Sequence, residues 1–190
     1  SKNLHFRKTF VYLSVMPNFK NDTTMRKLKF ILVIFLLTIG QATFACDCDS
    51  QGEFLKVAPK TEFVALVKVT KYLTFKDIYG KQTPMSMEVE VIDVYKGTET
   101  RKTITVWGDN GILCRPYLSQ FDTGKYYVIA FYKGSDGTKG HVHKDEKTTD
   151  YSISICGAYW LKADIKKQVA TGSVTEKQTQ IKLTDLKAKL

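Results

Sequence analysis

The residues best suited to chemistry are Cys46 and Cys48, which are separated by Asp47 and follow a strongly apolar stretch. Residues 25–45 have a basic start, a core of about ten apolar residues and a small residue at Ala45. This is the pattern of a secretory signal peptide, too short and wrongly flanked for a membrane span. Cleavage after Ala45 would make Cys46 the first residue, and its α-amine and carbonyl oxygen could then chelate a metal ion.

The start of the secreted chain has two alternatives to Cys46 with a free amine. Residues 40–42 also match a cleavage signal, and cleavage there would begin the chain at Thr43. Ala45 before Cys46 is also compatible with a bacterial lipoprotein, whose lipid would block the amine, although the usual Leu three residues upstream is missing. Residues 1–24 show no sustained period and are interpreted as an upstream extension outside the fold.

Charge and length favour one secreted domain without a nucleic-acid partner. Of the 29 basic and 19 acidic residues, seven and one precede Cys46, so residues 46–190 carry a net charge of +4. They contain no basic stripe interleaved with aromatic residues, which argues against nucleic-acid binding. We expect a monomer, either extracellular or, in a bacterium, in the periplasm or on the outer surface. Residues 46–170 should form the domain, with a polar tail over residues 171–190.

All four cysteines follow the signal peptide, and an even number in an exported chain predicts two disulfides. A bridge between Cys46 and Cys48 would close a tight, strained ring. Two pairings remain, and both tie the N-terminal segment to Cys114 and Cys156. Either pairing would fix the N-terminal segment to distant parts of the chain.

The apolar pattern predicts an all-β domain with flanking helices. A helix is expected over residues 49–57, with Ser50 as its N-cap, and another over residues 158–170. Five strands with these two helices fit a closed or partly closed barrel of the OB type. Period-two alternation and β-branched or aromatic residues place the five strands at residues 63–75, 85–95, 102–107, 125–132 and 151–156.

The order of these features resembles the inhibitory N-terminal domain of the tissue inhibitors of metalloproteinases, within the netrin-like family of OB barrels. The similarity covers about residues 46–165 and lacks both the third disulfide and the C-terminal domain of the animal proteins. The features that carry it are Cys46-x-Cys48 after the signal peptide, the apolar strand at residues 63–69, Val94-Tyr95-Lys96-Gly97, Cys114 in the next loop, and Ile153-Ser154-Ile155-Cys156 followed by Trp160.

The resemblance implies both a disulfide pairing and a binding mode. It implies disulfides Cys46–Cys114 and Cys48–Cys156. The partner would be a zinc metalloprotease, whose catalytic zinc keeps an open position for water. The amine and carbonyl of Cys46 would displace that water, so the zinc belongs to the partner and no cofactor of the chain's own is expected. The protease-binding residues that the resemblance implies are Cys46, Asp47, Cys48, Ile112, Leu113 and Cys114.

Asp47 is the residue that fits this binding mode least well. It would point toward the specificity pocket of the protease, where the family usually has a small or hydroxyl residue. An unpaired carboxylate is costly to bury in an apolar pocket. Three alternatives therefore stay open: a target with a basic or wet pocket, weak inhibition, or a fold that has lost the activity.

Other candidate sites are weaker, and an enzyme is not expected. His141 and His143 have the minimal spacing for a metal pair, but no further ligand accompanies them, so we expect an exposed loop. Asp145 and Glu146 are interpreted as a solvated face. No set of side chains suited to nucleophilic or acid–base catalysis is apparent. The alternative function is a non-inhibitory extracellular or envelope protein-interaction module of the same fold, including a form anchored by lipid at Cys46.

Overall fold

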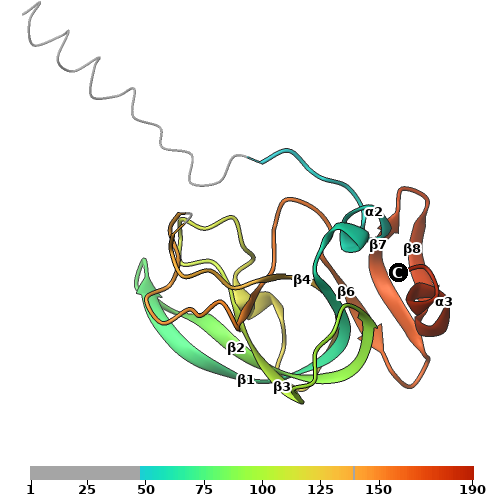
Figure 1. The fold of residues 1–190 in the computed structure, drawn as a ribbon, viewed down its shortest axis with the longest axis horizontal. Helices are drawn as coiled ribbons and strands as arrows, with labels where there is room; N and C mark the ends of the chain where they lie inside the picture. The colour runs from blue at the N-terminus through green and yellow to red at the C-terminus, as the bar shows by residue number, and fades with distance from the viewer. Residues whose placement is uncertain (1–47, 139) are drawn as a thin grey trace, which may run out of the picture. The chain divides into compact units, whose positions relative to one another are not determined.

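A β-sheet that closes on itself dominates the computed structural model, which describes residues 48–138 and 140–190 (Figure 1). The ring runs in the order β1, β2, β3, β5, β4, and β1 pairs with β4 to close it. The β3–β5 pair is parallel and the other pairs of the ring are antiparallel. The predicted five-stranded barrel is therefore confirmed as a closed, mixed β-barrel. Its strands are β1 (Phe63–Ile78), β2 (Lys81–Lys96), β3 (Thr103–Trp107), β4 (Tyr126–Lys133) and β5 (Tyr151–Ser152).

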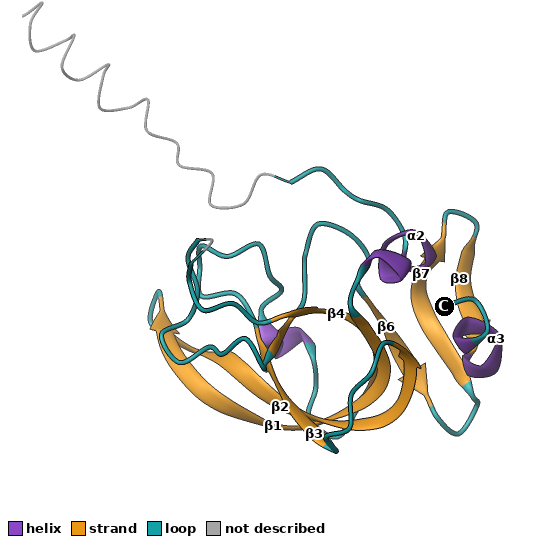
Figure 2. Ribbon diagram, in the orientation of Figure 1, coloured by secondary structure: helices purple, strands orange, loops and turns teal. Residues whose placement is uncertain are grey.

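Three further strands extend the sheet beyond the barrel. β6 (Trp160–Asp164) pairs with β4, β7 (Val169–Thr175) with β6, and β8 (Gln178–Lys182) with β7. Figure 2 shows β7 and β8 beside the barrel, together with the two short helices α2 (Phe54–Val57) and α3 (Leu183–Lys187). Short 3₁₀ turns at Ala58–Lys60 and Leu118–Gln120 complete the elements.

The barrel is filled by apolar side chains from the strands predicted by their alternation. The first half of β1, residues 63–69, is almost continuously buried, whereas its second half continues outward into an exposed hairpin with β2. Phe63, Phe131 and Tyr151 form an aromatic cluster with ring centroids 5.1–5.6 Å apart. Such contacts add to the free energy of burying the rings. Register shifts between β1 and β2 accommodate the curvature that closure requires.

The Val94-Tyr95-Lys96-Gly97 motif has a structural role at the end of β2. Tyr95 is buried in the core, and the Lys96 ammonium donates to the carbonyl oxygens of Pro59, at 2.5 Å, and Thr61. Gly97 has a φ of +80°, and a Cβ at this position would lie 2.4 Å from the Glu62 carbonyl oxygen. Only glycine fits a turn that combines this φ with so close an approach. The motif fixes β2 against the segment that enters β1.

The N-terminal helix is shorter than predicted. It covers only Phe54–Val57, and no side chain caps its first turn, so Ser50 is not its N-cap. Residues 49–52 instead form a non-helical segment that hydrogen-bonds to Cys156 and Ala158. The tertiary pairing of that segment outweighs the local capping preference.

The prediction of a second helix over residues 158–170 is wrong. Residues 160–164 form β6, a turn follows, and β7 begins at Val169. The Asp164 carboxylate accepts hydrogen bonds from the amides of Lys166 and Lys167, which stabilises the turn. A short apolar run fits a strand or a helix equally well, and here pairing with β4 decides for the strand.

Residues 171–190, expected as a polar tail, are part of the fold. They complete β7 and form β8 and α3, and four of their apolar side chains are buried in the core: Val174, Ile181, Leu183 and Leu186. The last barrel strand is also shorter than expected, because β5 contains only Tyr151 and Ser152 and residues 153–156 continue as loop. The five predicted strands account for the barrel, but the prediction did not include β6, β7 and β8, which extend the sheet.

Candidate functional site

The described N-terminal segment is held to the rim of the barrel by a disulfide and by backbone hydrogen bonds. Cys48 and Cys156 form a disulfide, with their Cα atoms 5.6 Å apart, which confirms this part of the predicted pairing. The amide of Gln51 donates to the Cys156 carbonyl at 2.6 Å, and the amide of Ala158 donates to the Gly52 carbonyl at 2.9 Å. The segment from Cys48 to Gly52 is therefore fixed to the segment from Cys156 to Ala158.

The loop after β3 reaches the same place. The sulfur atoms of Cys48, Cys114 and Cys156 all lie within 4.8 Å of one another. The amide of Ile155 donates to the Cys114 carbonyl at 3.2 Å, which joins this loop to the segment before Cys156. The structure thus brings together Cys48 and the Ile112–Cys114 loop, which are about 65 residues apart in the sequence.

The sulfur cluster is a covalent staple. Zinc sites use cysteine thiolates, and the two sulfurs of a disulfide do not supply that charge. Cys48 and Cys156 are bonded to each other, and Cys114 is also disulfide-bonded. Its predicted partner, Cys46, lies outside the described residues, as does Asp47. The pairing Cys46–Cys114 and the chelating role of Cys46 therefore stay predictions.

One carboxylate and one amide side chain, those of Asp109 and Asn110, fix the shape of the Ile112–Cys114 loop. The Asp109 carboxylate accepts a hydrogen bond from the Leu113 amide at 2.7 Å, and the Asn110 side-chain oxygen accepts one from the Ile112 amide at 3.2 Å. Side chains that bond the backbone a few residues ahead fix a turn without secondary structure. They hold Ile112 outward, with 53% of its surface exposed.

A buried ion pair fastens this loop to the connection between β4 and β5. The Arg115 guanidinium binds the Glu146 carboxylate through two hydrogen bonds of 2.7 and 2.9 Å. The Glu146 side chain is fully buried, and only 12% of the Arg115 side chain is exposed. Glu146 also accepts a hydrogen bond from the Ser135 amide, so its carboxylate joins three segments. A bidentate, buried pair of this kind fixes geometry as well as adding energy.

His143 and Trp107 make a second link between the same two loops. The His143 Nε2 lies 2.8 Å from the Gly108 carbonyl oxygen, and its ring packs on Trp107 at a tilt of 32°, with centroids 4.7 Å apart. The Trp107 indole donates to the Asp150 carboxylate at 2.9 Å. Burial lowers the pKa of His143, an effect that the Gly108 hydrogen bond partly offsets. His143 is therefore a neutral donor to Gly108 at neutral pH.

The predictions for the 134–150 connection are corrected in two places. His143 and Glu146 were expected on exposed polar surface, yet both are buried. His141 is exposed, as expected. The sequence contained one usable signal, because Arg115 directly follows the apolar run Ile112–Cys114 and a charge that is buried there needs a partner. Which acid would supply it was not visible in the sequence.

The resulting surface is an exposed rim around the disulfide. Cys48, Ile112 and Cys114 are exposed, and Ile155, which the sequence did not single out, is 45% exposed beside them. Apolar side chains that stay exposed on a rigidly held loop are suited to contact another protein. The rim offers main-chain and apolar groups for binding.

Comparison with known proteins adds no relative. Searches of the chain against protein-family models and against curated proteins find no match. Within residues 48–138 and 140–190, no helix has the length and apolar character needed to cross a membrane.

Proposed function

We propose that the protein is a secreted inhibitor of zinc metalloproteases that binds its target through the rim around Cys48. The observation that carries this proposal is the convergence of Cys48 and the Ile112–Cys114 loop, with sulfurs within 4.8 Å. These are the two segments that the resemblance to the tissue inhibitors of metalloproteinases implies as the binding ridge. The site has no catalytic role of its own in this proposal.

In this mechanism the chelating atoms are the α-amine and carbonyl oxygen of Cys46. They would occupy the open position of the protease's catalytic zinc and exclude the water that becomes the nucleophile. The amine must be neutral to bind zinc, and a free α-amine has a pKa of about 7.7–8.0. Inhibition should therefore weaken as the pH falls below this range.

The rigid attachment of the neighbouring segments supports such a mode of binding. Cys48 is held by the disulfide to Cys156, and the Ile112–Cys114 loop is held by Asp109 and by the Arg115–Glu146 pair. A segment that is ordered before binding loses little conformational entropy when the complex forms. The exposed Ile112 and the half-buried Leu113 would then contact apolar surface beside the zinc.

The topology supports a finer assignment of the fold. The ring order β1-β2-β3-β5-β4 with a parallel β3–β5 pair is compatible with an OB-type barrel, and we propose the netrin-like type because of the positions of the four cysteines. The β7–β8 hairpin and α3 lie outside that common core. The protein also lacks the third disulfide of the animal inhibitors.

The first experiment is the intact mass of the secreted protein with and without reduction. A chain that starts at Cys46 with two disulfides and no lipid is expected.

The second experiment compares inhibition by this form with inhibition by a form that carries a single alanine before Cys46. Both are tested against a panel of zinc endopeptidases and one serine protease. The extra residue moves the amine away from the zinc, so inhibition should be lost. Enzymatic removal of the alanine should restore it, which controls for misfolding. Equal inhibition by both forms would refute the mechanism.

A second candidate function is a protein-interaction module that binds no zinc. The observation in its favour is the outer half of the β1–β2 hairpin, where Leu73, Phe75 and Tyr79 are exposed. D47T distinguishes the two functions, because it removes a carboxylate from the proposed protease contact. Tighter protease binding by this variant supports the inhibitor, and unchanged behaviour in every inhibition assay supports the module.

A further inference from the structure

A polar pocket of about 460 Å³ lies at the start of β3, apart from the cysteine cluster. It is formed by the β2–β3 connection, the end of β4 and the loop before β5. β3 leads away from it, and the Ile112–Cys114 loop follows the opposite end of that strand. The pocket is lined by Thr98, Glu99, Thr100, Arg101, Lys133, Thr148 and Thr149.

Two cations in this pocket converge on one buried aromatic ring. The Lys133 ammonium lies 4.4 Å from the centroid of the Tyr151 ring, and the Arg101 guanidinium lies 5.7 Å from it. Tyr151 is fully buried, so its ring and hydroxyl hold fixed positions beneath the cations. The cation–π contacts favour this arrangement, and they place both positive charges in the lining of the same pocket.

The one carboxylate in the pocket lining is already saturated. Glu99 accepts hydrogen bonds from the side chain of Arg101 at 2.6 and 3.0 Å, from the Arg101 amide at 2.9 Å and from the Tyr151 hydroxyl at 2.8 Å. These contacts lower the pKa of Glu99 to about 2, chiefly through the Arg101 side chain. Glu99 is therefore ionised at every ordinary pH, and the three charged side chains sum to +1.

The remaining groups of the pocket can all donate hydrogen bonds. An ammonium has three N–H groups, and among the described residues the Lys133 ammonium donates only to the Tyr151 oxygen, at 2.8 Å. Arg101 uses its Nε and Nη2 on Glu99 and the Thr149 carbonyl, so the Lys133 ammonium carries the open N–H groups. Four threonines line the rest of the pocket. Donors with a net positive charge, and no open carboxylate, select for an anion.

We propose that this pocket binds an oxyanion, that is, a carboxylate, sulfate or phosphate group, between Lys133, Arg101 and the threonine hydroxyls. The anion would neutralise the excess positive charge around Tyr151 and accept the N–H groups that the protein leaves open. The inference does not depend on the proposed protease inhibition, because the pocket contains none of the residues of that site.

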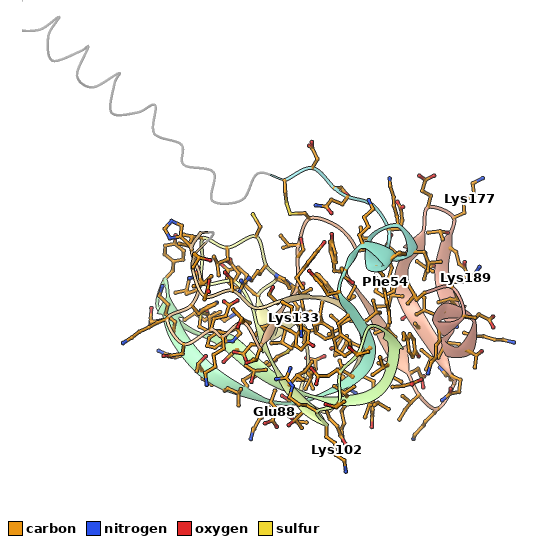
Figure 3. All side chains as sticks on the ribbon, in the orientation of Figure 1. Phe54, Glu88, Lys102, Lys133, Lys177 and Lys189 are labelled. Carbon is orange, nitrogen blue, oxygen red and sulfur yellow. A yellow bond between two sulfur atoms is a disulfide. The ribbon has the colours of Figure 1, made fainter. Side chains whose placement is uncertain are left out.

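The test is a titration of the ¹⁵N-labelled protein with sulfate, phosphate or acetate, at constant ionic strength set with sodium chloride. The amide signals of Arg101, Thr148 and Thr149 report the pocket. K133Q removes one pocket cation. K102Q is the matched control, because it makes the same change in charge directly after Arg101 at a residue outside the pocket lining. Figure 3 labels both side chains, Lys133 over the middle of the barrel and Lys102 at its lower edge in this view.

The wild-type protein and K102Q should give saturable shifts confined to the pocket signals, and K133Q should bind at least about tenfold more weakly, the loss expected for one charge-assisted hydrogen bond. Saturation by sulfate and phosphate alone assigns a tetrahedral anion, and saturation by acetate as well assigns a carboxylate-binding site. Equal affinity of K133Q and wild type would overturn the proposal. Amide shifts that do not saturate and that occur near surface lysines throughout the protein would also overturn it. Matching amide spectra of the free variants establish that K133Q is folded.

Discussion

The buried pair between Arg115 and Glu146 should be the most sensitive polar contact of the site. E146Q removes the charge of Glu146 and leaves the Arg115 guanidinium, only 12% exposed, without its counter-charge. Breaking a buried pair in this way costs about 3–5 kcal/mol, and since glutamine keeps one acceptor oxygen we expect about 3 kcal/mol for E146Q. Domains of this size have stabilities of about 5–15 kcal/mol, so the variant should still fold.

Urea denaturation measures this loss, with D93N as the matched control. Asp93 pairs with Lys187 at 2.6 Å, but their side chains are 44% and 47% exposed, so D93N should cost less than about 1 kcal/mol. R115Q should resemble E146Q, and the double variant should cost far less than the sum of the two, with a coupling of at least about 1.5 kcal/mol. Additive single losses, or a loss for E146Q no larger than for D93N, would refute the role of this pair.

Hydrogen exchange tests whether the pair also positions the binding loop. The Leu113 amide is bonded to Asp109 and the Ile155 amide to the Cys114 carbonyl, so both report the order of the loop. Their exchange should accelerate in E146Q by more than the global loss of stability explains, and it should be unchanged in D93N. Protease inhibition, where it is present, should weaken in parallel. Unchanged exchange at both amides would leave the pair with a stabilising role alone.

Three further predictions follow from the packing. The stabilising contribution of Glu99, whose pKa falls from 4.5 to about 2 on folding, is fully present above pH 4.5 and lost between pH 4.5 and pH 2; E99Q should lose this part of the acid transition, as followed by circular dichroism. Replacing Cys48 and Cys156 with serine opens a loop of 108 residues and should cost up to about 4.7 kcal/mol in thermal or urea unfolding, whereas a loss below about 1 kcal/mol would contradict the staple. L186A should cost about 2–5 kcal/mol because Leu186 is fully buried, while T184A on the exposed side of α3 should cost under about 1 kcal/mol, and similar values for both would contradict the docking of α3.

The barrel strands were predictable because their signal is local. Alternation and β-branched or aromatic residues identified β1, β2, β3 and β4 to within a few residues. One side of each strand must face the core whichever strands it pairs with. The two-residue alternation of apolar side chains is therefore present in the sequence for any order of the strands. The cysteine spacing likewise carried the Cys48–Cys156 pairing, through the resemblance to a known family.

The sequence by itself thus determined a disulfide-bonded β-barrel with an N-terminal cysteine segment. The tertiary structure alone decided the rest, because the deciding partners are distant in the chain. Pairing with β4 made residues 160–164 a strand, and burial of Leu183 and Leu186 made the C-terminal segment part of the fold. Glu146 became the buried partner of Arg115, 31 residues away, because closure of the barrel brings their loops together. Propensity and period describe neighbours along the chain, and these choices depend on neighbours in space.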